Sequence, residues 1–118
     1  MKDNLRDMSK EFASMIIKLY KHLEENREFI ISKQILRSGT SIGANIRESE
    51  YASSRKDFLN KLCISLKECN ETAYWLELLY ENDYIPKYLY DEVYTKCLSI
   101  LRMLKASTRT IKEREDNE

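Results

Sequence analysis

Apolar residues recur every three or four positions along most of this chain, which is the spacing of one face of an α-helix. The most regular series alternates steps of three and four residues and consists of Leu59, Leu62, Leu66, Cys69, Ala73, Leu76 and Tyr80. A second such series consists of Tyr90, Val93, Cys97, Ile100, Leu104, Ser107 and Ile111. Left-handed packing of bundled helices requires this regularity. The pattern therefore predicts two long amphipathic helices in the second half of the chain.

The first half of the chain predicts two further helices, of which the second is unusual. An apolar stripe centred on Phe12 predicts the first helix. In the second, isoleucines are interspersed with small residues, including Gly39 and Gly43, the only two glycines of the chain. A glycine inside a helix costs about 1 kcal/mol relative to alanine. We therefore expect this helix to approach a neighbour closely and to occupy the centre of the packing.

Polar segments and capping signals set the expected helix boundaries. Ser54 is an expected N-cap, with Asp57 in the capping-box position three residues later. Pro86 fits the first turn of the last helix, where its missing N–H does no harm. The end of the second helix, at Ser49 or at Ser53, stays open. The expected helices are residues 5–23, 28–51, 54–81 and 87–112, followed by a charged tail at 113–118.

Composition agrees with an all-α fold in a single domain, residues 1–118. One proline and two glycines in 118 residues leave few places for the chain to turn. Four helices with short connections predict an antiparallel up-down-up-down four-helix bundle. No apolar run approaches the roughly 18 residues of a membrane span, and the N-terminus lacks the pattern of a signal peptide. Three cysteines without metal-type spacing fit a reducing compartment. We therefore expect a cytoplasmic protein that does not contact a membrane.

The charges cancel in total but not in their expected distribution. In the predicted topology, the start of the first helix, the end of the second, the start of the third and the end of the fourth form one basic pole. Its candidate nucleic-acid or partner-binding residues are Arg47, Arg55, Lys56, Arg102, Lys105, Arg109 and Lys112. The last four lie on one face of the last helix, which favours a platform for phosphates or an acidic protein surface. The alternative is a solvated helix face with counter-charges nearby.

Catalytic and metal chemistry find little support in the sequence. His22 is the only histidine, so a turn or core-edge role is favoured over that of a general base. Cys69 and Cys97 fall on apolar stripes and are expected to be small buried hydrophobes, with a disulfide the less favoured reading. Glu68 and Glu71 lack the Glu-x-x-His pairing of bundle metal sites. We expect neither an enzyme nor a bound cofactor or metal.

Two polar residues of the second helix are expected to face the third helix. Antiparallel pairing about a turn near residue 53 places Arg37 opposite Glu71 and Asn45 near Ser65. This pairing predicts an Arg37–Glu71 ion pair and a buried Asn45 bonded across the interface, both of which would fix the helix register. The alternative is that each side chain points to solvent.

Apolar residues off the main stripe of the third helix predict a second buried face. These residues are Phe58, Tyr74, Trp75, Leu78 and Leu79. A second apolar face is more than a lone bundle needs, so it favours burial against another subunit.

Three stretches carry a resemblance to a known family. The segments are QILRSGTSIGANI (34–46), SRKDF (54–58) and ISLKECNETAYWLELL (64–79). They resemble the bacterial 23S rRNA-intervening sequence protein family, named for reading frames within intervening sequences of large-subunit ribosomal RNA genes. The resemblance implies an antiparallel four-helix bundle, a ring-shaped homopentamer and no known enzymatic activity. The motif residues, expected to be structural, are Arg37, Ser41, Asn45, Glu71 and Trp75.

The resemblance also suggests partners. The accessory variability protein of diversity-generating retroelements looks similar and is a basic pentamer that binds a reverse transcriptase and nucleic acid. RNA, DNA or a reverse-transcriptase-like protein is therefore the implied partner of the basic pole. The alternatives are an oligomeric protein scaffold that does not bind nucleic acid and, more remotely, a metal or redox bundle built on Cys69 and Cys97.

Overall fold

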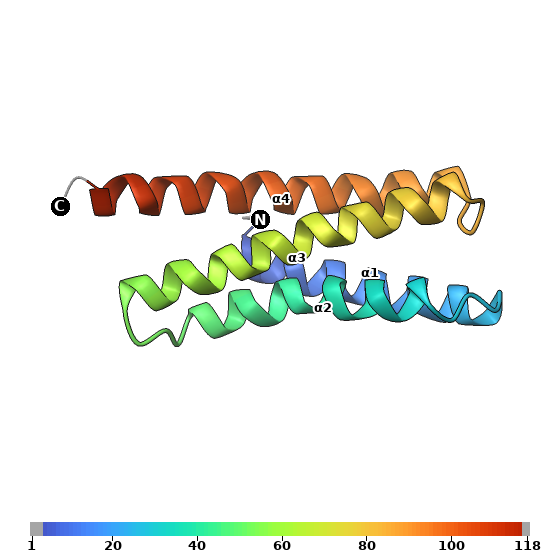
Figure 1. Ribbon diagram of the computed structural model, residues 1–118, viewed down its shortest axis with the longest axis horizontal. Helices are drawn as coiled ribbons and strands as arrows, with labels where there is room; N and C mark the ends of the chain where they lie inside the picture. Colours follow the sequence, from blue (N-terminus) through green and yellow to red (C-terminus); the bar gives the residue numbers. More distant parts are fainter. Residues whose placement is uncertain (1–3, 117–118) are drawn as a thin grey trace.

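The periodic stretches of the sequence form four helices. The computed structural model describes residues 4–116, which contain α1 (Leu5–Glu25), α2 (Ile31–Ser49), α3 (Arg55–Glu81) and α4 (Lys87–Asp116) and no strand. In Figure 1 the helices run along the long axis of the molecule and are joined by connections at its two ends. α1 and α3 each pack against α2 and α4, whereas the backbones of the diagonal pairs do not approach each other closely within the described residues. The predicted all-helical class is confirmed.

The N-termini of α1 and α3 are capped by side chains. Asn4 accepts a hydrogen bond from the Asp7 N–H at 2.8 Å, a cap that the sequence reasoning missed. The predicted cap of α3 is confirmed, because Ser54 Oγ accepts from the Asp57 N–H at 3.0 Å. The Asp57 carboxylate in turn accepts from the Ser53 N–H at 3.1 Å, one residue before the position that a standard capping box uses.

The start predicted for α2 was wrong by three residues. The predicted start at Glu28 is corrected to Ile31, since Arg27 turns the chain with a φ of 64°. Glu28 instead caps α2 from outside the helix, where its carboxylate accepts from the Ser32 N–H at 2.6 Å. At the other end α2 stops at Ser49, which is the earlier of the two ends that the sequence left open and two residues before the approximate bound at residue 51.

The last helix is longer than predicted. α4 continues to Asp116, four residues past the expected end at 112, so most of the expected charged tail at 113–118 is helical. Ile111 still packs against the core, and the residues that follow contain no glycine or proline to stop the helix. Residues 117 and 118 lie outside the described part of the chain.

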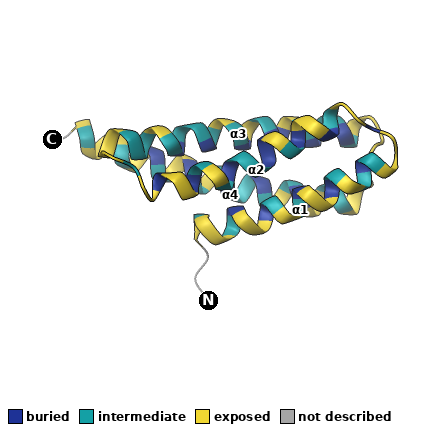
Figure 2. Ribbon diagram, turned by 90° about the horizontal axis from the view of Figure 1, so that it is seen from below, coloured by how far each residue is buried: buried dark blue, intermediate teal, exposed yellow. Residues whose placement is uncertain are grey.

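The buried residues line the inner sides of the four helices, as the dark blue segments of Figure 2 show. The stripes predicted for α3 and α4 supply Leu62, Leu76, Ile100 and Leu104 to this core. Leu79, which was assigned to a second apolar face of α3, is also fully buried in it. That prediction is therefore corrected, and the second face is smaller than the sequence suggests.

α1 approaches α2 closely at the two glycines of α2. A Cβ atom added to Gly39 would lie 2.8 Å from Cγ1 and Cγ2 of Ile16, which is fully buried. A Cβ atom on Gly43 would lie 3.2 Å from Ser9 Oγ and 3.3 Å from its carbonyl oxygen. The prediction that α2 approaches a neighbour closely is confirmed.

Candidate nucleic-acid interface

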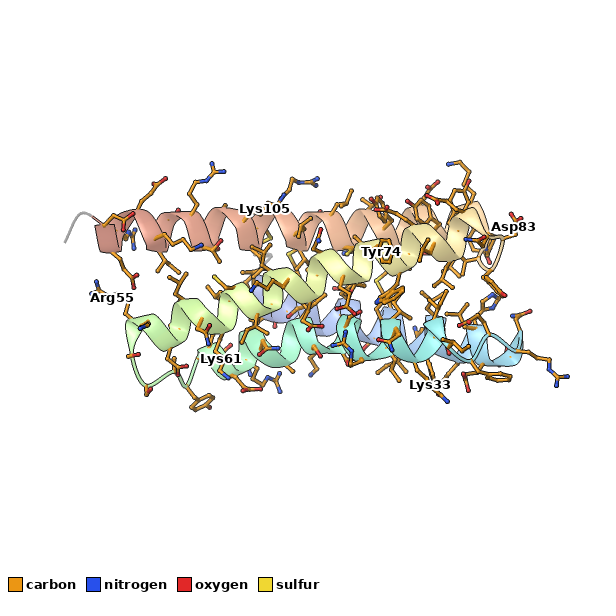
Figure 3. All side chains as sticks on the ribbon, in the orientation of Figure 1. Lys33, Arg55, Lys61, Tyr74, Asp83 and Lys105 are labelled. Atoms are coloured by element: carbon orange, nitrogen blue, oxygen red, sulfur yellow. The ribbon has the colours of Figure 1, made fainter. Side chains whose placement is uncertain are left out.

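Four helix ends surround an open cavity at one end of the molecule. The cavity has a volume of about 780 Å³ and is lined by residues from the start of α1, the end of α2, the start of α3 and the end of α4. Its apolar floor includes Ile46, Phe58, Leu62 and Ile111. Figure 3 shows Arg55, Lys61 and Lys105 in this half of the molecule, whereas Lys33 and Asp83 lie toward the other end.

The seven cations predicted to bind a partner are all exposed, but they fall into two groups. One group follows a single row of α4 and is called the α4 row: Arg102, Lys105, Arg109 and Lys112. The other group flanks the α2–α3 connection and consists of Arg47, Arg55 and Lys56. The structure therefore places four of the predicted residues together on one helix face.

The α4 row carries no ion pair to any described carboxylate. Other lysines are neutralised locally: Lys61 pairs with Glu48 at 3.1 Å and Lys96 with Glu11 at 3.7 Å. Single exposed lysines without such partners occur elsewhere on the surface. What sets the α4 row apart is that four such cations follow one another at helical spacing, which creates a local positive potential.

A hydrogen bond to α3 shows which flank of α4 carries this row. Tyr94 precedes the row by two steps of four residues, through Leu98 to Arg102. Its hydroxyl donates to Glu77 Oε2 of α3 at 2.7 Å, and this bond raises the pKa of Tyr94 above its usual value. Tyr94 also stacks on Tyr90 with a ring-centroid distance of 4.8 Å. The row therefore continues a flank of α4 that is bonded to α3.

The predicted ion pair between α2 and α3 is confirmed. Arg37 donates to Glu71 and, at 2.9 Å, also to Glu68, a second partner that the sequence reasoning missed. Glu68 lies three residues before Glu71, so helical spacing is the signal that could have revealed it. The Trp75 indole donates to Glu71 at 2.9 Å. These two donors, Trp75 first and Arg37 second, lower the pKa of the Glu71 carboxyl.

The prediction for Asn45 was wrong. Its side chain is only half-buried, and its amide donates to the Ser41 carbonyl of the same helix at 2.9 Å. Two buried hydroxyls make the bonds across the α2–α3 interface, Ser65 to the Ile42 carbonyl at 2.8 Å and Thr72 to Ser38 at 2.9 Å. These fully buried contact positions carry small polar residues, whereas Asn45 lies at the edge of the contact. Ser41 likewise bonds within α2, to the Arg37 carbonyl at 2.6 Å.

Replacing Glu71 by glutamine should make stability less dependent on pH. A carboxyl group whose folded pKa is lowered stabilises the protein above its unfolded pKa, near 4.3, and loses that contribution as the pH falls through the folded value. We expect the E71Q variant to be less stable than the wild type by about 0.5–1 kcal/mol at pH 7, the range for partly exposed pairs. Urea unfolding at pH 7 and at pH 3 measures this difference, which should shrink at the lower pH. Glu92, exposed and without an ion pair to a described residue, provides the control variant E92Q, and an equal loss there would contradict the prediction.

The candidate catalytic groups lie in structural positions. Cys69 and Cys97 are fully buried with their sulfur atoms 3.8 Å apart, so their assignment as small buried hydrophobes is confirmed. The hydrogen bond with Cys69 and burial both raise the pKa of the Cys97 thiol, which keeps it neutral. His22 is half-buried near the end of α1, where its carbonyl accepts from the Asn26 amide at 2.8 Å.

The described residues lack both a metal-binding cluster and a membrane-spanning helix. Residues 4–116 contain no group of three or more His, Cys, Asp or Glu side chains placed to hold a metal ion. Within the same range, no helix has the combination of length and apolar character that crossing a membrane requires.

Comparison with known proteins gave one family and a closely similar solved structure. Residues 2–106 match the family described as 23S rRNA-intervening sequence protein. The similar structure is that of a protein with unknown function from the S23 ribosomal protein family of Bacteroides thetaiotaomicron. It is 54% identical in sequence and has a TM-score of 0.87, and the match covers 89% of this chain and 98% of that chain. No curated protein is similar enough to be matched.

Proposed function

This chain belongs to the 23S rRNA-intervening sequence protein family, and we propose that it is a non-enzymatic, cytoplasmic helical protein that binds nucleic acid. The α4 row is the proposed contact surface. One observation carries the proposal: four consecutive exposed cations of this row lack ion pairs to described carboxylates. Exposed cations at helical spacing favour polyanionic phosphate, because each phosphate contact releases a condensed counterion.

The proposal includes a specific architecture and assembly. The architecture is an antiparallel up-down-up-down bundle, which the short connections and the contacts between neighbouring helices support. The assembly is a homopentamer, which rests on the resemblance to the family. The basic pole then repeats around the assembly, so several weak contacts act together on one nucleic acid.

A second candidate function is an oligomeric scaffold with a protein partner, such as a reverse-transcriptase-like enzyme. The observation in its favour is an aromatic pair on the surface of α3, where Tyr74 is 53% exposed and its ring centroid lies 5.2 Å from that of Trp75. Exposed aromatic residues are typical of protein interfaces. The dependence of binding on salt separates the two functions.

Removing the α4 row should abolish most nucleic-acid binding. The variant R102Q/K105Q/R109Q/K112Q replaces four exposed cations, none of which is part of the buried core. We expect it to lose about 100-fold or more in affinity for a structured RNA at low salt. We also expect the slope of log K against log salt to become shallower by about three to four, at about 0.9 per lost phosphate contact. Fluorescence anisotropy across a salt series measures both quantities, and light scattering of the same samples gives the subunit number, for which five is expected.

The matched control removes four exposed cations from the other half of the molecule. These are Lys18, Lys21, Arg27 and Lys33, each replaced by glutamine. The control variant has the same net charge as the α4-row variant and should keep at least a third of the wild-type affinity. Equal losses in both variants would show that net charge alone attracts the RNA. Absence of RNA binding to the wild type at low salt would leave the protein-partner scaffold.

A further inference from the structure

A second row of exposed cations lies on α3 beside the α4 row. The residues that precede Glu77 at alternating intervals of three and four positions lie along one side of α3 and form a row. In order along the chain, they are Lys56, Asn60, Cys63, Lys67, Asn70 and Tyr74. Lys56 and Lys67, the cations of this α3 row, are both exposed and have no ion pair to a described carboxylate. Lys67 was not among the binding residues predicted from the sequence.

The α3 row and the α4 row share one flank of the molecule. At one end of the two rows, the hydroxyl of Tyr94 on α4 donates a hydrogen bond to Glu77 Oε2 on α3 at 2.7 Å. From this bond both rows run toward the end of the molecule that holds the 50–54 connection, and in Figure 1 α3 moves away from α4 along this path. A cavity of about 340 Å³ lined by Arg55, Phe58, Ile111 and Arg114 occupies the space between the helices at that end. The cations therefore form two separate lines rather than one cluster.

The dimensions of these lines match the two strands that border a groove of a double helix. At about 1.5 Å per residue, Lys56 to Lys67 spans roughly 16 Å and Arg102 to Lys112 spans about 15 Å. Packed helix axes lie about 8–10 Å apart, and the long side chains of two diverging helices extend this separation. The major groove of B-form DNA is about 12 Å wide and is bordered by two lines of phosphates. Two cation lines of similar length at this separation can each follow one phosphate strand.

The residues between the two lines disfavour a single strand. Binding of single-stranded nucleic acid relies on aromatic side chains on which successive bases stack. Besides the cations, the two rows carry Asn60 and Cys63 between Lys56 and Lys67, and Asn70 and Leu98 next to the cations, none of which offers a stacking surface. Tyr74 lies beyond the cations, near the hydrogen bond between Tyr94 and Glu77. Tyr51, which is 86% exposed, belongs to the connection between α2 and α3. The face offers contacts to phosphates without contacts to bases, which positions a duplex without reading its sequence.

We infer that the basic face formed by the α3 row and the α4 row binds double-helical nucleic acid, with one row on each phosphate strand. This inference rests on the proposed nucleic-acid function and adds the class of ligand and the role of Lys56 and Lys67. Two carboxylates, Glu113 and Asp116, line the same shallow cavity as Lys105, Arg109 and Lys112, so they reduce the positive charge at the C-terminal end of the α4 row. Recognition through phosphates alone makes the binding independent of sequence.

The test compares four ligands with the full-length protein. They are a 16-base-pair RNA duplex, a DNA duplex of the same sequence, one RNA strand alone and polyglutamate. We expect at least one duplex to bind tenfold or more tightly than the single strand, and polyglutamate to bind more weakly than either duplex. A single strand that binds as tightly as both duplexes would overturn the inference but leave the proposed function in place. Failure of all three nucleic acids would end the proposed function itself, and polyglutamate binding as tightly as a duplex would indicate an acidic protein partner instead.

A variant of the α3 row separates the contribution of each line. The K56Q/K67Q variant changes two exposed residues of α3, and K18Q/K21Q on α1 is its matched control. Because each lost phosphate contact changes the slope of log K against log salt by about 0.9, the α3 variant should lower the slope for the duplex by about two. We expect its duplex affinity to fall about tenfold and its single-strand affinity to change less than threefold. Unchanged duplex binding, with circular dichroism showing an intact fold, would contradict a contact through the α3 row.

Discussion

Replacing Phe12 by alanine should lower the free energy of unfolding by about 3–5 kcal/mol, the range for phenylalanine removed from a core. Phe12 is 0% exposed and is the first of the fully buried side chains that α1 contributes to the core. The loss combines the transfer free energy of the ring with the cavity left behind, because helices on both sides restrict collapse of the site. Urea unfolding followed by circular dichroism measures the difference.

Met15, three residues along the same helix, offers the matched control for Phe12. It is only half-buried, so the M15A variant should lose clearly less stability than F12A. If the F12A protein does not fold, F12L retains most of the buried volume and should be destabilised by about 1–2 kcal/mol. Equal and small losses in F12A and M15A would contradict the placement of Phe12 in the core.

Introducing a leucine at Gly39 should destabilise the protein by about 3 kcal/mol or more through overpacking. Even a Cβ atom at this position would lie 2.8 Å from two carbons of Ile16. Ile16 cannot turn away easily, because its β-branched side chain is restricted at χ1 and is fully buried. Leucine favours a helix over glycine by nearly 1 kcal/mol, so any observed loss understates the packing cost. Thermal and urea unfolding measure the effect.

The control for Gly39 lies on the exposed side of the same helix. Ala44 is exposed at the rim of an open cavity between α1 and α2, so the A44L variant adds an aliphatic side chain to α2 where there is room for it. We expect its stability to change by less than about 0.5 kcal/mol. A G39L protein as stable as A44L would show that α1 and α2 are not held at the distance described.

The sequence predicted the helices better than it predicted their ends. Apolar spacing located all four, since a helix in a layered core must show its period in its own residues. The start of α2 was missed because a carboxylate four residues before Ser32 caps it, an arrangement different from the usual N-cap signal. The end of α4 was missed because a run of charged residues is compatible with either a helix or a frayed tail.

The sequence predicted which cations are exposed, but it did not predict how they are grouped on the surface. Seven exposed cations and the Arg37–Glu71 pair followed from spacing and simple antiparallel pairing. The division into two groups and the proximity of Lys67 to the α4 row depend on the rotation of α3 and α4 about their axes. The packing of the buried apolar faces sets that rotation, and the hydrogen bond from Tyr94 to Glu77 shows the flank on which the two helices meet.

By itself the sequence determined the helical class, the residues that form the core stripes, the close-packing helix with its two glycines and the family. Local periodicity and backbone preference suffice for these features, because each is encoded within a single segment. Only the tertiary structure decided that Ser65 and Thr72, rather than Asn45, bond across the α2–α3 interface. It also decided that the four cations of the α4 row have no ion pair to a described carboxylate. Such pairings depend on side-chain packing between two helices at once, and a displacement of one helical position changes every partner.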